Sequence, residues 1–154
     1  MKRHGTARWE GGFKNGGGYI STESGALLHA PYAVRTRFEA DRGTNPEELI
    51  AAAHAACFSM ALSKELDEIG FTVDRIETKA EVTLDKSAGG FAISKSELHV
   101  KACVPGCPVD KFDQAAMRAK DGCPVSKALR AEVTMKAELA GKQEMWQGEH
   151  GRAA

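Results

Sequence analysis

The chain has 154 residues, 42% hydrophobic and 27% charged, and its 21 Lys and Arg residues balance 21 Asp and Glu residues. This length suits one compact domain, and the apolar content is too high for a disordered chain. A formal net charge of +0 argues against a partner such as nucleic acid or an anionic membrane surface. No secretory signal is visible, and the longest apolar stretch, residues 49–62, is shorter than the roughly 20 residues of a membrane span. We expect a soluble, cytoplasmic protein.

The first 43 residues alternate in polarity and contain several glycine turns, which predicts three strands. We expect them at residues 8–10, 19–22 and 32–39. On the third strand, Arg35 and Arg37 would share the face opposite Val34, Thr36 and Phe38. The simplest interpretation of two arginines on one strand face is contact with solvent.

A strong helix signal follows at residues 44–48. Asn45 is a good N-cap, Pro46 fits the first helical position, and Glu48 occupies the place of a capping-box carboxylate. We expect this helix to run to about residue 69 and to stop at Gly70. From residue 49 to 62 it is apolar on every side, which predicts a helix that is buried all round. A domain of this size struggles to cover such a helix, so a second subunit is the natural cover.

The rest of the chain predicts a hairpin of two alternating strands, two helices and a final strand. We place the hairpin turn at 87–90, the helices at 109–120 and 123–129, the last strand at 133–139, and a polar tail at 141–154. The order of elements predicts an α+β fold with antiparallel sheets around a long buried central helix. We expect one domain over residues 1–140, with a three-stranded part at 1–43 and a helix-containing part at 44–140.

Four cysteines carry the candidate chemistry, and they lack the paired C-x-x-C spacing typical of zinc sites. Cys103 and Cys107, with His99, leave a metal-binding module open as an alternative. Cys57 lies in an apolar helix, where a thiol has a raised pKa and needs a cation from another segment to act as a nucleophile. His54 could contact it as a base, although a lone His on a helix is more often structural.

Four segments resemble the OsmC/Ohr family of thiol-dependent hydroperoxide reductases, and the OsmC branch most closely. They are residues 35–39 (RTRFE), 44–49 (TNPEEL), 53–62 (AHAACFSMAL) and 122–126 (GCPVS). The resemblance covers about residues 7–139. It implies an intertwined homodimer with two active sites at the subunit interface, reduction of organic hydroperoxides and of hydrogen peroxide, and no metal or organic cofactor.

The resemblance also implies a role for each site residue. Cys57 matches the peroxidatic cysteine and Cys123 the resolving one, while Arg37 matches the arginine that stabilises the thiolate and Glu47 the carboxylate that orients it. The implied cycle passes through a Cys57 sulfenic acid and a Cys57–Cys123 disulfide, which an external lipoyl or thioredoxin-like dithiol reduces. Phe58 and Met60 would suit the organic tail of the substrate. A redox sensor or small-molecule carrier on the same fold stays an alternative.

Overall fold

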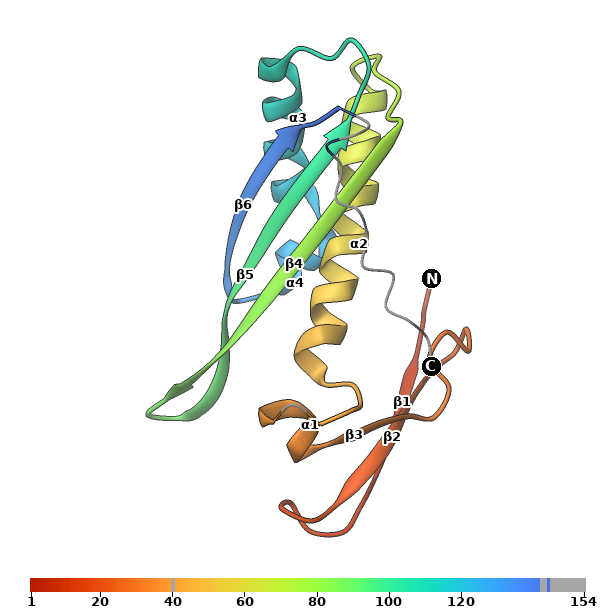
Figure 1. The fold of residues 1–154 in the computed structure, drawn as a ribbon, viewed down its shortest axis with the longest axis vertical. Coiled ribbons are helices and arrows are strands. Elements are labelled where there is room, and N and C mark those ends of the chain that lie inside the picture. Colours follow the sequence, from red (N-terminus) through yellow and green to blue (C-terminus); the bar gives the residue numbers. More distant parts are fainter. Residues whose placement is uncertain (40, 142–143, 145–154) are drawn as a thin grey trace. The chain divides into compact units, whose positions relative to one another are not determined.

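The structure is a computed structural model that describes residues 1–39, 41–141 and 144, and most of the predicted tail at 141–154 lies outside the described residues. The chain divides into two compact units, Met1–Leu49 and Ile50–Ala154. Each unit contributes a three-stranded sheet (Figure 1). The mixture of helices and sheets confirms the α+β prediction.

The sheet of the first unit is antiparallel, with the strand order β1-β2-β3. Its strands are β1 (Gly5–Glu10), β2 (Gly17–Thr22) and β3 (Ala30–Ala33). Every residue of β1 is exposed. Within the described part of this unit, Thr44 alone is buried. The first sheet therefore has no core of its own.

The third predicted strand is wrong beyond Ala33, because the chain turns there into the short helix α1 (Val34–Phe38). The Thr36 hydroxyl explains this break. It accepts a hydrogen bond from the Ala33 N–H at 2.9 Å, and it lies 2.9 Å from the Ala33 carbonyl. Such a local side-chain bond replaces the ladder bonds of a strand. Arg35 and Arg37 consequently lie on a helix, where residues two apart do not share a face.

The predicted long helix is α2 (Pro46–Asp67). Its start confirms Asn45 as the N-cap, since the Glu48 N–H donates to Asn45 Oδ1 at 2.9 Å. The Glu48 carboxylate accepts from the side chains of Thr44 and Asn45. After its end, Gly70 adopts a φ of 87°, a left-handed conformation that favours glycine. By length and composition alone, α2 is the one helix of the described chain that could cross a membrane.

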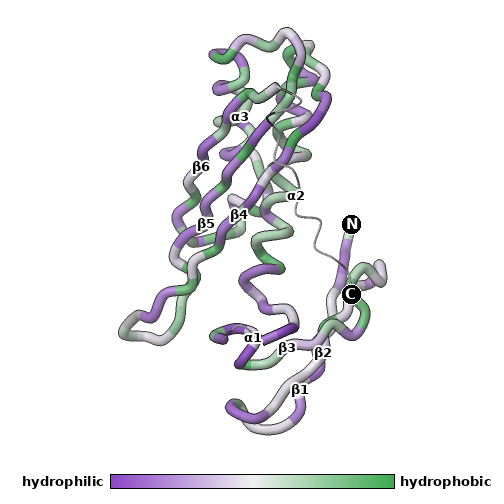
Figure 2. The backbone as a smooth tube through the Cα atoms, viewed as in Figure 1, coloured by the Kyte–Doolittle hydropathy of each residue, from purple (hydrophilic) through white to green (hydrophobic). Residues whose placement is uncertain are grey.

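The prediction that α2 is buried all round is wrong for a single copy of the chain. One stripe at four-residue spacing is buried, made of His54, Phe58, Leu62 and Leu66. Other apolar positions are exposed, including Ala52, Ala53, Ala56 and Met60, and Met60 is 68% exposed. Figure 2 shows the hydrophobic character of α2 along much of its length.

The second sheet combines an antiparallel hairpin with a parallel strand. Its strands are β4 (Arg75–Ser87), β5 (Gly90–Cys103) and β6 (Glu132–Leu139). β6 pairs parallel to β5, so the expectation of purely antiparallel sheets is wrong here. The physical reason is the crossover through α3 (Val109–Gly122) and α4 (Pro124–Ala128), which carries the chain back before the last strand begins.

The core of the second unit lies between this sheet and two helices. One hydrophobic cluster includes Phe58, Leu62 and Leu66 of α2. The inward face of β5 adds Leu98, Val100 and Ala102 to it, and α3 adds Phe112, Ala115, Ala116 and Ala119. The alternating colours of β5 in Figure 2 follow the two faces of the strand. This core supports the segments that carry both Cys57 and Cys123.

Candidate active site

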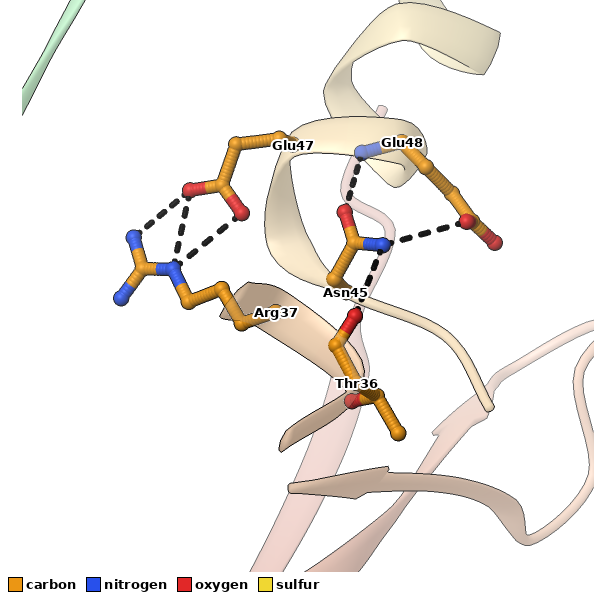
Figure 3. Close-up of polar contacts among 5 residues, drawn as sticks. All are labelled: Thr36, Arg37, Asn45, Glu47 and Glu48. Carbon is orange, nitrogen blue, oxygen red and sulfur yellow. Dashed lines mark hydrogen bonds and ion pairs between the residues drawn. The ribbon is translucent and has the colours of Figure 1, made fainter. Parts of the chain in front are cut away.

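In the first unit, Arg37 and Glu47 form a two-point ion pair. Arg37 Nη2 lies 2.6 Å from Glu47 Oε1, and Arg37 Nε lies 3.1 Å and 3.2 Å from the two carboxylate oxygens. Figure 3 shows the guanidinium directed at the carboxylate. The Glu47 side chain is 12% exposed and that of Arg37 is 34% exposed. A paired arginine with one accessible side keeps its charge and can still donate to a further anion.

The turn between α1 and α2 makes this pairing possible. Gly43 has a φ of 145°, and a Cβ there would lie 2.6 Å from Thr36 Cγ2. Asn45 then ties the two helices together, because its amide nitrogen lies 3.4 Å from the Thr36 carbonyl and 3.2 Å from Glu48 Oε2 (Figure 3). Glycine and asparagine at these two positions therefore bring the first turn of α2 beside Arg37.

Arg35 has a different partner. Its Nε lies 3.3 Å from Asp41 Oδ2, and its side chain is 67% exposed. The structure thus separates the two arginines that the sequence places side by side. Arg37 also borders a cavity of about 210 Å³, whose other lining residues are mainly apolar: Trp9, Phe13, Tyr32, Ala33, Val34, Phe38 and Pro46.

In the second unit, Cys57 and Cys123 lie in contact, with 3.2 Å between their sulfur atoms. Both are free thiols. Cys57 projects from α2 and is partly exposed, whereas Cys123 lies between α3 and α4 and is fully buried. Helix α4 begins directly after Cys123, with Pro124 in its first turn. The backbone amides of the following residues therefore reach the sulfur atoms.

The surroundings of the two sulfurs shift their pKa values in opposite directions. Burial raises the pKa of Cys57, opposed by a hydrogen bond from the Val125 backbone. Burial also acts to raise the pKa of Cys123, but hydrogen bonds from Ser126, Cys57 and Val125 outweigh it and bring the pKa below its ordinary value. Cys57 therefore needs a further cation to become a thiolate, as the sequence predicted.

His54 contacts serines and makes no hydrogen bond to Cys57 within the described residues. Its Nδ1 lies 2.8 Å from Ser96 Oγ and its Nε2 lies 2.8 Å from Ser126 Oγ, and the ring is fully buried. Burial lowers the pKa of His54, so the ring is neutral near neutral pH. This geometry favours the structural interpretation of His54 over the one in which it is the base of Cys57.

The other two cysteines lie away from this chemistry. Cys103 is buried at the end of β5, and Cys107 donates to its neighbouring carbonyl at Pro108 over 3.5 Å. Burial raises the pKa of Cys107, which makes it a poor nucleophile. No group of three or more His, Cys, Asp or Glu side chains in the described chain is placed to hold a metal ion. Cys103, Cys107 and His99 therefore do not form the ligand set of the alternative metal module.

The structure thus brings the four predicted site residues together as two pairs, one in each unit. It also adds Ser96 and Ser126, to which sequence reasoning gave no role. Phe58, expected near the substrate tail, is instead fully buried in the core. Ser96 was detectable as a polar residue on the inward face of β5, two positions before Leu98.

Comparison with known proteins identifies a family and several relatives of this chain. The family described as OsmC-like protein matches residues 39–138. Peroxiredoxin OsmC of Escherichia coli (strain K12) is 55% identical over 139 residues, which are 90% of this chain and 97% of that protein. Organic hydroperoxide resistance protein OhrB of Bacillus subtilis (strain 168) is 33% identical over 123 residues, which are 79% of this chain and 88% of that protein.

Solved structures show the same fold. The crystal structure of OhrB of Bacillus subtilis superposes with a TM-score of 0.69 at 33% identity, covering 91% of this chain and 98% of that one. An organic hydroperoxide resistance protein OsmC from Legionella pneumophila gives a TM-score of 0.68 at 26% identity, covering 90% of this chain and 97% of that one. The two sheets and the central helix are therefore a shared architecture.

Proposed function

Because the chain belongs to the OsmC family of thiol-dependent hydroperoxide reductases, we propose that Cys57 and Cys123 carry its reaction, with Arg37 and Glu47 as its electrostatic support. The observation that supports this assignment most strongly is the contact of a partly exposed sulfur with a fully buried one at 3.2 Å. Cys57 is partly exposed to solvent, whereas Cys123 has no exposed surface. This asymmetry matches an attacking thiol and a resolving thiol.

The proposed reaction has two steps on the protein. The Cys57 thiolate attacks one peroxide oxygen, the O–O bond breaks, and the leaving oxygen takes a proton and departs as an alcohol, or as water when the substrate is hydrogen peroxide. Cys57 is thereby oxidised to a sulfenic acid. The Cys123 thiolate then attacks Cys57 Sγ, the S–O bond breaks, and the hydroxyl leaves as water after taking a proton. An external lipoyl or thioredoxin-like dithiol reduces the resulting disulfide by exchange.

Arg37 is the proposed cation for the first step. Its guanidinium is always charged, and it can stabilise both the Cys57 thiolate and the charge that develops on the leaving oxygen. Glu47 holds it in place through three hydrogen-bonded contacts. The mainly apolar cavity beside Arg37 supports an organic group on the substrate.

A homodimer completes this proposal. Exposed apolar side chains on α2, Met60 among them, need a cover, and one copy of the chain leaves them in solvent. We infer an intertwined dimer in which each copy contributes to the site of the other, the guanidinium from one copy and the thiols from its partner. Residues 1–140 then act as one functional domain in the cytoplasm, without a nucleic acid or membrane partner.

Peroxide turnover tests this proposal. Wild type, Cys57→Ser and Cys123→Ser are compared in steady-state reduction of cumene hydroperoxide with a dithiol reductant. Cys57→Ser should lose at least about 1000-fold, because a hydroxyl is far less ionised than a thiol. Cys123→Ser should oxidise once and then stall or overoxidise.

Mass spectrometry of the peroxide-treated wild type supplies the second criterion. A 57–123 disulfide is the expected product, and a 103–107 disulfide in its place would refute the resolving role of Cys123. A wild type that oxidises once and does not turn over with any dithiol is a redox sensor rather than an enzyme.

A further inference from the structure

A chain of hydrogen bonds runs from the interior of the second unit to the resolving thiol. It starts at Ser96 Oγ, passes through both ring nitrogens of His54 at 2.8 Å each, and reaches Ser126 Oγ. The Ser126 side chain in turn hydrogen-bonds Cys123. Ser96, His54 and Cys123 are fully buried, so water does not compete along most of this path.

In the thiolate form that would attack a sulfenic acid, Cys123 fixes the direction of these bonds. A thiolate only accepts, so the Ser126 hydroxyl donates its hydrogen to Cys123 Sγ. The Ser126 oxygen then accepts from His54 Nε2–H, which leaves Nδ1 of the neutral ring as an acceptor for the Ser96 hydroxyl. Each donor thus points toward the sulfur, and the polarised chain strengthens the last bond.

The same contacts argue against His54 as a proton acceptor. Both of its nitrogens meet neutral hydroxyls, and among the described side chains no carboxylate forms an ion pair with the ring. A buried imidazolium without an anionic partner is unfavourable. The ring therefore acts as a fixed neutral connector between two serines.

We propose that His54 and Ser126 are positioning residues of the resolving step: His54 holds the Ser126 hydroxyl on Cys123 Sγ, and this bond stabilises negative charge on the buried sulfur as it attacks Cys57. The inference rests on the proposed function, since it concerns the attack of Cys123 on the Cys57 sulfenic acid. In that step the S–S bond forms, the S–O bond breaks, and the hydroxyl of the sulfenic acid leaves as water after taking one proton. Cys123 is oxidised and Cys57 is reduced to the disulfide level.

Removing the hydroxyl tests the last bond of the chain. Reduced wild type and Ser126→Ala are mixed with one equivalent of cumene hydroperoxide between about pH 5 and about pH 9 and quenched at successive times. Mass spectrometry then follows the Cys57 sulfenic acid and the 57–123 disulfide separately. Ser126→Ala should shift the pH midpoint of disulfide formation upward by about one unit and slow this step about tenfold below the midpoint.

Two substitutions of His54 test the connector. His54→Leu removes both ring nitrogens and should reproduce the upward shift. His54→Gln can place an amide N–H near the position of Nε2, and it should bring the midpoint back toward the wild-type value. Ser59→Ala is the matched control, because it removes a half-buried hydroxyl of α2 that bonds Thr78 and Ala55 and lies outside this chain of hydrogen bonds. It should leave the midpoint unchanged.

The outcomes separate this inference from the proposed function. If the wild type forms no 57–123 disulfide, both fail together. If the wild type and Ser126→Ala both form the 57–123 disulfide with the same pH midpoint, the positioning role alone is refuted. A merely structural role would lower thermal stability and slow disulfide formation equally at every pH, with no shift of the midpoint and no rescue by His54→Gln.

Discussion

The two units of the chain bury their side chains very differently. The second unit has a core in which Phe58, Phe112 and Leu62 have no exposed surface. In the first unit every residue of β1 is exposed, and Phe13 is 71% exposed. The second unit therefore has its own hydrophobic driving force, which the described part of the first unit lacks.

The proposed site residues are also divided between these two units. The ion pair of Arg37 with Glu47 belongs to the weakly buried unit, and the two thiols belong to the well-packed one. A sulfur that must meet another sulfur at contact distance gains from a rigid core. A guanidinium that must meet an incoming substrate needs an accessible side. The difference in burial is thus consistent with the proposed division of labour between a thiol pair and an electrostatic pair.

The largest expected effect comes from placing a charge on the exposed apolar part of α2. Ala56→Arg should abolish dimer formation and with it nearly all peroxidase activity, because a buried unpaired charge is strongly unfavourable. Light scattering at micromolar concentration measures the assembly. Asp67→Arg, at an exposed position at the end of α2, is the control and should stay dimeric. A fully active species with the mass of one 16.5 kDa chain would contradict the dimer.

The next largest effect tests the electrostatic half of the site. Arg37→Ala should slow formation of the Cys57 sulfenic acid by about 100- to 1000-fold and raise the pKa of Cys57, because the thiolate loses its cation. Stopped-flow oxidation and the pH profile of thiol alkylation measure the two quantities. Arg35→Ala is the matched control, since Arg35 pairs with Asp41, and it should change either quantity little.

Mixed dimers sharpen the same test. Neither Arg37→Ala nor Cys57→Ser should turn over alone, but a dimer of one copy of each has one complete site if the copies complement each other. Unfolding and refolding the two variants together should restore about half of the wild-type rate per mixed dimer. Mixtures that stay inactive despite dimer formation would mean that each chain completes its own site.

A matched pair of phenylalanine substitutions measures the difference in burial directly. Phe112→Ala should lower the free energy of unfolding by about 3–5 kcal/mol, because it leaves a cavity in the core. Phe13→Ala should stay within about 0.5 kcal/mol of wild type, as for other surface positions. Denaturant unfolding measures both values. A comparable loss for Phe13→Ala would show that the first unit is packed against another surface in solution.

The smallest expected effect concerns pH. Burial holds the pKa of His54 below its ordinary value of 6.5, so the folded state binds fewer protons there than the unfolded state. This contribution to stability is complete above about pH 6.5 and is lost as the pH falls below it. His54→Gln should therefore show a shallower loss of melting temperature between about pH 6.5 and about pH 5. If the melting temperatures of wild type and His54→Gln fall equally between about pH 6.5 and about pH 5, this assignment is contradicted.

Local signals explain what the sequence could predict. Asn45 and Pro46 marked the start of α2 because capping depends on adjacent residues, and Gly70 marked its end in the same way. The alternation of Leu98, Val100 and Ala102 identified the inward face of β5. The strand predicted through residue 39 failed because one hydroxyl, that of Thr36, redirects the backbone at Ala33.

Contacts between segments far apart in the sequence could not be predicted from local signals. The ring of His54 meets serines 42 and 72 positions away, and no spacing rule connects them. The proposed roles of Cys57 and Cys123 came from the family resemblance rather than from their separation of 66 positions. The parallel direction of β6 could not be predicted either, because an alternating strand has the same polarity pattern in either direction.

The parallel pairing of β6 with β5 has a consequence for the newly made chain. Cys123 lies in the crossover between these two strands, and β6 is the last strand of the described chain. Pairings between segments far apart in sequence form late, because the loop must close before any contact stabilises it. We therefore expect the contact between Cys57 and Cys123 to form late in folding, once β6 has paired with β5.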